Sequence, residues 1–247
     1  MNIIAKSALA AVVIAALTGT AMAKDTVLVA GATGKSGRAI ITSLLDQGYA
    51  VRAMVRNPAK ATDLGAGVEL VTADVTKKET LPAAVKGVDY VISTIGAVPF
   101  GADVPEKIDY QGVADLVDAA KAAGVKHFGL MTSMGAGSED PNEQLNKMFN
   151  MILKWKGKGE EHLRKSGLPY TIVRPGGLAD CEPGKTGLKV STMKGTGGGQ
   201  VCRADAGLTL VEAIKNPAFH GKTFAVVKDD AAPVDGWKKD VAALPKD

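Results

Sequence analysis

The sequence predicts an α/β fold built on a doubly wound parallel sheet, and three observations support that prediction. Short and mostly apolar strands alternate with helical patterns, as expected of a parallel sheet that is buried on both faces. The first strand runs directly into three glycines and then into a helix. The chain has 247 residues, of which 46% are hydrophobic, so it is long enough for one large domain with a well-buried core. Right-handed crossovers would place helices on both faces of the sheet.

Strand and helix patterns follow one another in order after Lys24. The strands predicted before Pro175 lie at residues 27–30, 50–55, 68–72, 90–94, 127–131 and 170–174. The helices between them are predicted at residues 37–47, 58–63, 79–85, 106–123 and 141–166. After a loop rich in glycine, lysine and threonine over residues 176–199, which holds a short strand near 188–190, we predict a helix at 203–214, a strand at 222–227 and a weak helix at 234–243. This last part is too short for a large second domain, so we expect a small cap over the carboxyl ends of the strands, where such sheets bind ligands.

The turn after the first strand has the pattern of a dinucleotide-binding site. Its glycines are Gly31, Gly34 and Gly37, and the residues between them include Thr33, Lys35 and Ser36. The first glycine allows a sharp exit from the strand, the second lets a diphosphate approach the backbone, and the third lets the helix pack closely on the strand. The spacing departs from the commonest Gly-x-Gly-x-x-Gly pattern, and a glycine-rich turn without a ligand remains the alternative.

Residues at the ends of the next strands predict which dinucleotide binds. Arg56 stands where sites that prefer NAD have a carboxylate, and a guanidinium there can hold the 2′-phosphate of NADP, with Lys35 or Arg38 assisting. Asp74 and Val75 are placed to contact the adenine, although Asp74 also suits a turn or a helix N-cap. Thr94 and Gly96 end the fourth strand, where Gly96 lets the backbone pass close to a ribose.

Taken together, these motifs resemble the short-chain dehydrogenase/reductase superfamily, in its atypical NAD(P)H-binding branch of NmrA-like and flavin/biliverdin reductase-like proteins. The residues that match are Gly31–Gly37, Val55–Pro58, Ala73–Val75, Ser93–Gly96, Ala119–His127 with Thr132 and Ser133, and Tyr170–Leu178. The resemblance implies a Rossmann fold from about Lys24 to Val227 and places Pro175 beside the nicotinamide carboxamide.

The resemblance also implies a catalytic Tyr-x-x-x-Lys element, and the chain departs from it. Lys156 fits the lysine, which binds the nicotinamide ribose, and Ser133, or less well Thr132, fits the catalytic hydroxyl. Ile152 occupies the tyrosine position and cannot transfer a proton. We therefore expect an NADPH-dependent oxidoreductase acting on a small molecule such as a quinone, a flavin or a similar conjugated acceptor, which takes protons from water. The alternatives are a non-catalytic NAD(P)H-binding sensor or assembly factor, and a chain that binds no dinucleotide.

The first 23 residues read as a secretory signal peptide, which leaves residues 24–247 as the dinucleotide-binding domain. Lys6 supplies positive charge, an apolar run follows, and Ala21-Met22-Ala23 is a cleavage signal. This predicts a periplasmic or secreted protein without a stable membrane span, although the cofactor is a cytoplasmic metabolite. A true start at Met22 would instead give a cytoplasmic chain.

Composition, the cysteines and the histidines indicate no further ligand or catalytic group. The net charge is +4 with no basic block, so nucleic acid is not an expected partner, and the oligomeric state stays open. Cys181 and Cys202 would pair in an exported protein or stay as two thiols, and neither has a histidine at metal-ligand spacing, so we expect no metal. His127, His162 and His220 are given no catalytic role.

Overall fold

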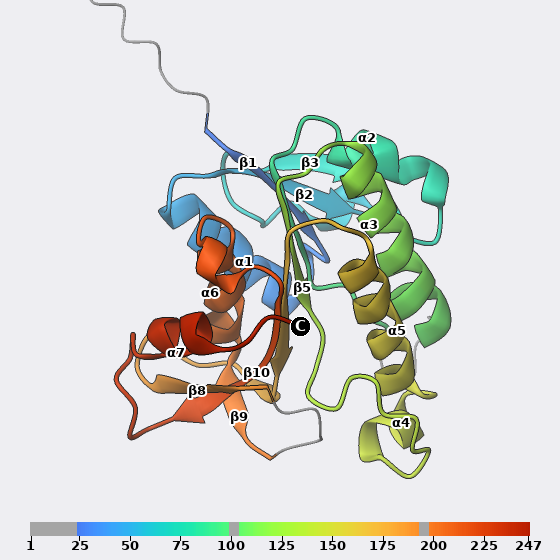
Figure 1. Ribbon diagram of the computed structural model, residues 1–247. Coiled ribbons are helices and arrows are strands. Elements are labelled where there is room, and N and C mark those ends of the chain that lie inside the picture. Colours follow the sequence, from blue (N-terminus) through green and yellow to red (C-terminus); the bar gives the residue numbers. More distant parts are fainter. Residues whose placement is uncertain (1–23, 99–103, 193–197) are drawn as a thin grey trace, which may run out of the picture.

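A computed structural model describes residues 24–98, 104–192 and 198–247, and Figure 1 shows a central sheet with helices on both faces. The predicted signal peptide lies outside the described residues. The main sheet has eight strands in the order β3-β2-β1-β4-β5-β6-β10-β8, and a second sheet pairs β7 with β9. The first six strands follow the spatial order 3-2-1-4-5-6, so the predicted doubly wound α/β fold is confirmed.

The predicted strands of the main sheet are present with small shifts at their ends. Within the described residues, the strands are β1 (Thr26–Ala30), β2 (Ala50–Val55), β3 (Glu69–Thr72), β4 (Tyr90–Ser93), β5 (His127–Met131), β6 (Tyr170–Pro175), β7 (Gly177–Ala179), β8 (Gly187–Ser191), β9 (Gln200–Cys202) and β10 (Lys222–Asp229). All pairs in the main sheet are parallel except β8 with β10. An antiparallel edge strand on an otherwise parallel sheet is common in large sheets of this class.

Helices and short turns connect these strands. The α-helices are α1 (Lys35–Asp46), α2 (Leu81–Val85), α3 (Val113–Ala122), α4 (Gln144–Met148), α5 (Ile152–Lys165), α6 (Arg203–Ala213) and α7 (Trp237–Ala243). Single turns lie at η1 (Pro58–Lys60), η2 (Lys78–Thr80) and η4 (Pro217–Phe219), and η3 (Glu106–Gly112) is a π-helical stretch that leads into α3. The predicted helix at residues 58–63 is therefore only one 3₁₀ turn.

Two apolar layers bury the sheet, and strand β1 contributes side chains to both. Val27 and Val29 pack into the layer that holds residues of α1, α6 and α7. Leu28 and Ala30 pack into the layer that holds residues of α2, α3 and α5. Successive side chains of a strand point to opposite faces, so an uninterrupted apolar run is what a strand covered on both sides requires.

One predicted helix, over residues 141–166, is wrong. The structure breaks it into α4 and α5 at Asn150 and Met151, whose φ angles are 49° and 63°. The buried Asn146 fixes the break: its Oδ1 accepts a hydrogen bond from Leu153 N, and its Nδ2 donates to the carbonyl oxygen of Ser138. A side-chain amide that satisfies backbone groups in this way competes with a continuous helix.

The segment after Pro175 does more than cap the sheet. β10 and β8 extend the main sheet beyond β6, whereas β7 and β9 form the small separate sheet. The short strand predicted near residues 188–190 is present as β8, whereas β7 was not predicted, because a strand of three residues is too short for a clear periodicity. Among the residues that the structure describes, no helix has the length and apolarity needed to cross a membrane.

Candidate functional site

The glycine turn has the close packing that its spacing predicts. Gly31 leaves β1 with a φ of 83°, a conformation that side chains disfavour, and its carbonyl oxygen accepts a hydrogen bond from Gly34 N at 3.0 Å. A Cβ on Gly37 would lie 2.3 Å from the carbonyl oxygen of Gly31, so only glycine allows α1 to begin this close to the strand. The N-cap of α1 is Gly34, which supplies no side-chain cap. The first amides of α1 therefore have no side-chain cap, which is typical of helix ends that bind anions.

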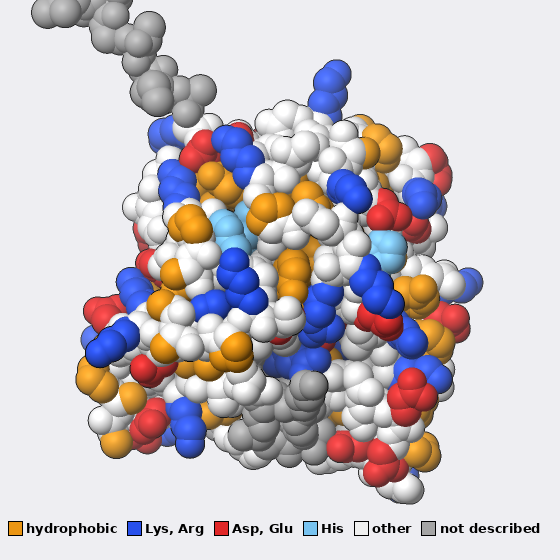
Figure 2. Space-filling model, in the orientation of Figure 1, with side chains coloured by type: hydrophobic (Ala, Val, Ile, Leu, Met, Phe, Trp, Pro, Cys, Tyr) orange, Lys and Arg blue, Asp and Glu red, His pale blue; other side chains and the backbone are white. Residues whose placement is uncertain are grey.

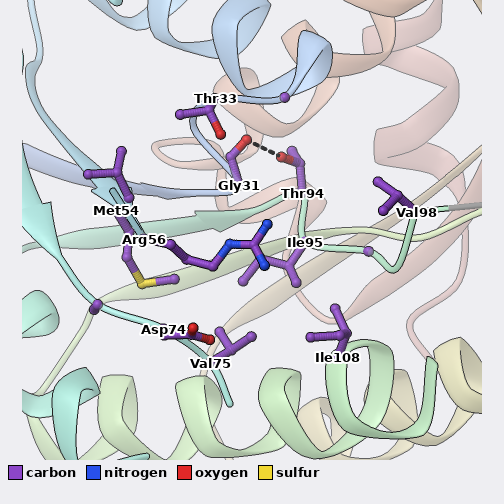
Figure 3. A pocket seen from close by; sticks show the side chains of 14 residues that line it. Gly31, Thr33, Met54, Arg56, Asp74, Val75, Thr94, Ile95, Val98 and Ile108 are labelled. Carbon is purple, nitrogen blue, oxygen red and sulfur yellow. Dashed lines mark hydrogen bonds between the residues drawn. The ribbon is translucent and has the colours of Figure 1, made fainter. Parts of the chain in front are cut away.

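Strand ends and the glycine turn enclose a cavity of about 200 Å³ (Figure 3). Eight residues predicted for cofactor binding line it, namely Gly31, Thr33, Gly34, Arg56, Asp74, Val75, Thr94 and Gly96. The apolar part of the lining includes Val55, Ala73 and Ile95, which belong to motifs noted in the sequence, and Met54, Val98 and Ile108, which the sequence analysis did not single out. These residues look like ordinary strand or loop positions in the sequence, and only the topology brings them to one edge of the sheet. A cavity with an apolar wall, a bare glycine turn and one cation fits the adenosine half of a dinucleotide.

Arg56 and Asp74 supply the charged side chains in the lining of this cavity. Figure 3 shows the Arg56 side chain reaching into the cavity between Gly31 and Asp74. Burial raises the pKa of Asp74, but hydrogen bonds from the amide and hydroxyl of Thr76 and the charge of Arg56 outweigh it and hold that pKa below its usual range. Asp74 therefore stabilises the turn after β3, which is one of the two roles expected from the sequence. Its carboxylate remains charged in the lining of the cavity.

The other residues of the glycine motif lie just outside this lining. The exposed Lys35 places its Nζ 2.5 Å from Asp180 Oδ2. Ser36 Oγ lies 3.4 Å from Nη1 of Arg203, which also pairs with Asp180. Hydrogen bonds from Lys35 and Arg203 lower the pKa of Asp180 to about 2. Asp180 and Arg203 escaped sequence reasoning because they lie far from the motif along the chain.

Lys156 lies beside Gly96, which lines the first cavity. Its Nζ is 2.6 Å from Oδ1 of Asp109, and a Cβ added to Gly96 would be 3.2 Å from that Nζ. The other oxygen of the buried Asp109 accepts a hydrogen bond from Ala97 N. The structure thus brings Lys156 to the strand end predicted to contact the ribose. Ile152 is buried at the start of α5, so no proton donor stands at the tyrosine position.

A second cavity, of about 590 Å³, follows the ends of β5 and β6. Predicted residues Ser133 and Pro175 line it together with Thr132, and apolar side chains come from Met134, Leu145 and Leu178. The Ser133 hydroxyl is buried and has no hydrogen-bond partner within the described residues. Thr132, in contrast, donates to Glu160 Oε1 at 2.7 Å. Of the two candidate hydroxyls, Ser133 is therefore the better placed to bond a ligand.

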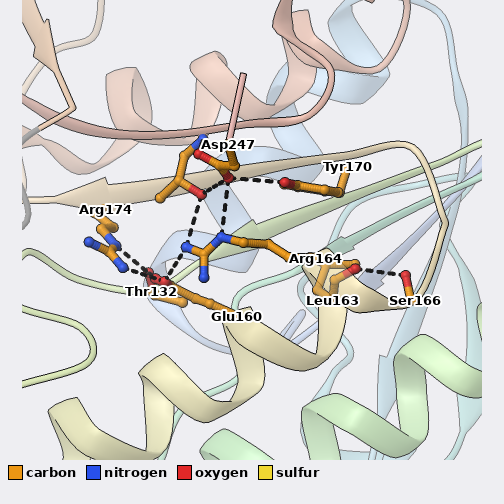
Figure 4. A network of polar contacts seen from close by, with 9 residues as sticks. Thr132, Glu160, Leu163, Arg164, Ser166, Tyr170, Arg174 and Asp247 are labelled. Carbon is orange, nitrogen blue, oxygen red and sulfur yellow. Dashed lines mark hydrogen bonds and ion pairs between the residues drawn. The ribbon is translucent and has the colours of Figure 1, made fainter. Parts of the chain in front are cut away.

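A buried ionic network begins at Thr132, which lines this second cavity (Figure 4). Glu160 of α5 is fully buried and accepts hydrogen bonds from Arg164, Arg174 and Thr132. Arg164 in turn contacts the carboxylate of Asp247, which also accepts from the hydroxyl of Tyr170. The network ties α5, which carries Lys156, to β6, which carries Pro175. Both arginines line a further cavity of about 740 Å³, and Figure 2 shows Lys and Arg side chains gathered at a hollow on this face.

The cysteines and histidines lie away from both ligand cavities. Cys181 and Cys202 form a disulfide, which decides between the two alternatives left open by the sequence. His127 is buried and bonds Thr171, His162 pairs with Asp118, and His220 stacks on His127. Within residues 24–98, 104–192 and 198–247, no cluster of acids, histidines and cysteines has the composition of a metal site.

Comparison with known proteins agrees with this geometry. A family model described as NAD(P)H-binding matches residues 31–217. Sanguinarine reductase of Eschscholzia californica is 33% identical over 81% of this chain and 88% of its own length. Protein TIC 62 of pea chloroplasts (Pisum sativum) is 35% identical over 89% of this chain, which spans only 46% of that longer protein. The structure of ChuY, an anaerobilin reductase from Escherichia coli O157:H7, superposes with a TM-score of 0.71 at 28% identity and covers 84% of this chain and 99% of its own.

The resemblance seen in the sequence is thereby confirmed. Two relatives named as reductases are matched over most of this chain, one in sequence and one in structure. The chain belongs to the NAD(P)H-binding family, with the Rossmann fold of its structural neighbours.

Proposed function

We propose that the protein is an NADPH-dependent oxidoreductase that reduces a quinone, a flavin or a similar conjugated acceptor. Two cavities at the carboxyl ends of the strands support this proposal most directly. The first holds the glycine turn with Arg56, and the second holds Ser133 and Pro175. Lys156 stands beside Gly96 at the end of the first cavity. Names of relatives such as sanguinarine reductase and an NAD(P)H azoreductase support an acceptor with a conjugated system.

The residues present suit a reaction in which the protein mainly orients the reactants. When bound, the nicotinamide supplies the hydride. The ammonium of Lys156 is placed to hold the ribose hydroxyls, and the Ser133 hydroxyl is placed to donate a hydrogen bond to the carboxamide or the acceptor. Ile152 provides no proton, so an acceptor that spreads the incoming charge over a conjugated system and takes its proton from water fits best.

The direct experiment is to mix purified protein with NADPH and with a quinone, a flavin or an azo dye, and to follow NADPH oxidation. We expect turnover with at least one of these acceptors. Measurable NADPH binding without oxidation of the coenzyme by any of them would reject the enzymatic proposal and leave the non-catalytic one.

A preference for NADPH over NADH is the second part of the proposal, and Arg56 is the residue that would cause it. Arg56→Gln removes a charge-assisted contact to the 2′-phosphate, so NADPH affinity should fall about 10- to 100-fold, or about 1–3 kcal/mol, while NADH affinity changes little. Titration of both coenzymes measures this. Lys60→Gln, which removes an exposed cation nearby, is the control and should change neither constant. An unchanged ratio in the Arg56 variant would remove that residue from the site.

A non-catalytic role is the second candidate, because Ile152 replaces the usual proton donor. TIC 62 and the photosystem II assembly factor Ycf39 are among the relatives, and only parts of those proteins are matched. In this role, NADPH would bind as above without being consumed.

We also propose that the chain is exported. The predicted signal peptide over residues 1–23 would place the protein in the periplasm or outside the cell. Determining the mature N-terminus together with the compartment tests this: a mature chain beginning at Lys24 supports export, whereas a cytoplasmic chain beginning at Met22 contradicts it.

A further inference from the structure

Three charged side chains from distant parts of the chain meet beside the glycine turn. Asp180, just after β7, accepts a hydrogen bond from Lys35 Nζ at 2.5 Å and another from Arg203 Nε at 2.8 Å. Lys35 is the first residue of α1 and Arg203 is the first residue of α6. Two cations are thus shared by one carboxylate where the amino-terminal ends of two helices converge.

Arg203 lies between the two ligand cavities. Its Nη1 is 3.4 Å from Oγ of Ser36, in the first turn of α1, and its Nη2 is 3.3 Å from the carbonyl oxygen of Leu178. Gly34, two residues before Ser36, lines the first cavity, and Leu178 lines the second. A dinucleotide that spans both cavities has its diphosphate between its two halves, close to this guanidinium.

The backbone on both sides of this charge cluster is held firmly. α6 packs so closely on α1 that a Cβ added to Gly207 would lie 2.8 Å from Cγ1 of Ile40. The disulfide joins Cys181, which follows Asp180, to Cys202, which precedes Arg203. The positions of Asp180 and Arg203 relative to the glycine turn are therefore built into the fold rather than set by the two side chains alone.

We propose that Arg203 binds the diphosphate of the dinucleotide and that Asp180 is a built-in anion that competes with the diphosphate for Arg203 and Lys35. A guanidinium suits this role because it can bond two phosphate oxygens at once. The Asp180 side chain is 57% exposed, against 20% for Arg203, so water reaches the carboxylate, and a ligand with more negative charge can replace it at the guanidinium. This inference rests on the proposed function and adds to it a device that sets coenzyme affinity.

The proposal predicts opposite effects for the two partners of one ion pair. Arg203→Gln should weaken NADPH and NADH by a similar factor, about tenfold, because both coenzymes carry the same diphosphate. Asp180→Asn should tighten both, about threefold or more, because it removes the competing charge and leaves both cations. Arg56→Gln, in contrast, should affect NADPH alone. Fluorescence or calorimetric titration measures the constants without reference to turnover.

The controls keep the outcomes separate. Glu182→Gln removes an acid that pairs with Lys185 on the same segment and should leave both constants unchanged. Arg203→Lys keeps the charge and should recover part of the affinity, and it replaces the glutamine variant if that one misfolds. The proposal is overturned if the Arg203 variants bind both coenzymes within twofold of wild type, or if Asp180→Asn weakens binding. If wild-type protein binds neither coenzyme, the proposed function itself fails.

Discussion

The Lys156 side chain has a contact that stabilises the fold, with Asp109, and a proposed contact with the coenzyme ribose, and mutation can separate the two. Its ammonium neutralises Asp109, whose side chain is only 1% exposed. Lys156→Met should therefore destabilise the fold by about 3 kcal/mol, because it leaves a buried carboxylate without its partner. The double variant with Asp109→Asn should regain most of that stability in denaturant titrations.

The double variant tests whether Lys156 also binds the coenzyme, because its fold is no longer strained by an unpaired Asp109. If Lys156 holds the ribose, the refolded double variant should still bind NADPH about tenfold more weakly than wild type, since a hydrogen-bonding cation is missing. Wild-type affinity in that variant would show that Lys156 serves the fold and not the coenzyme.

Alanine should have different effects at two glycines of the turn: it should lower stability at Gly37 and coenzyme affinity at Gly34. Gly37→Ala puts a methyl group 2.3 Å from the carbonyl oxygen of Gly31, so α1 must move and stability should fall by about 1–3 kcal/mol or more. Gly34→Ala meets only one atom, at 3.3 Å, and has an ordinary φ of −73°, so the fold should tolerate it. Its methyl group would instead obstruct the diphosphate. Thermal unfolding and NADPH titration of both variants check this, and equal losses of stability would contradict it.

At the scale of elements, the junction of β5, β6 and η4 should make stability depend on pH. Burial among these elements lowers the pKa of His127 to about 3, and the nearby His220, stacked at 4.3 Å, acts in the same direction. The unfolded chain binds a proton near pH 6.5 and the folded chain does not, so stability should fall as the pH drops from about 6 to 4, by up to about 1.4 kcal/mol per pH unit. Above that range the effect vanishes.

His127→Gln isolates this contribution. Glutamine can still bond the Thr171 hydroxyl, which now lies 3.0 Å from Nε2 of His127, but it does not titrate. The difference in unfolding free energy between variant and wild type should therefore change with pH only below about pH 6.5. A constant difference between pH 7 and pH 4 would show that His127 does not remain neutral in the folded protein.

The sequence predicted best those elements whose own residues determine them. β1 has an uninterrupted apolar run, and the glycines after it admit few conformations, so both the strand and the turn follow from local residues. The break between α4 and α5 was missed because it depends on Asn146 bonding backbone groups on both sides of it. Asp109 and Asp180 were missed for a similar reason: each is an ordinary acid in sequence and acquires its partner only when distant elements meet.

Across the chain as a whole, the disulfide links the two strands of the small sheet, because Cys202 is the last residue of β9 and Cys181 lies two residues after β7. It spans 21 residues, so loop-closure entropy gives an expected loss of about 3 kcal/mol in the unfolding free energy when both Cys181 and Cys202 become serine. Either single variant should lose about the same amount, and wild-type protein in a strong reductant should approach the same value. Chemical denaturation with and without reductant measures this. Stability that is independent of reductant would mean that the bond contributes nothing to the fold.

The same bond connects the fold to the compartment in which the protein works. Disulfides persist in oxidising compartments and are rare in the cytoplasm. If the predicted signal peptide is used, protein isolated from the periplasm or medium should begin at Lys24 and carry the bond quantitatively, as intact mass and thiol labelling would show. A chain that begins at Met22 should instead carry two free thiols and the lower stability of the reduced form. A mature exported chain with free thiols would contradict the prediction, since the 5.6 Å between the two Cα atoms lets the cysteines pair wherever the environment oxidises them.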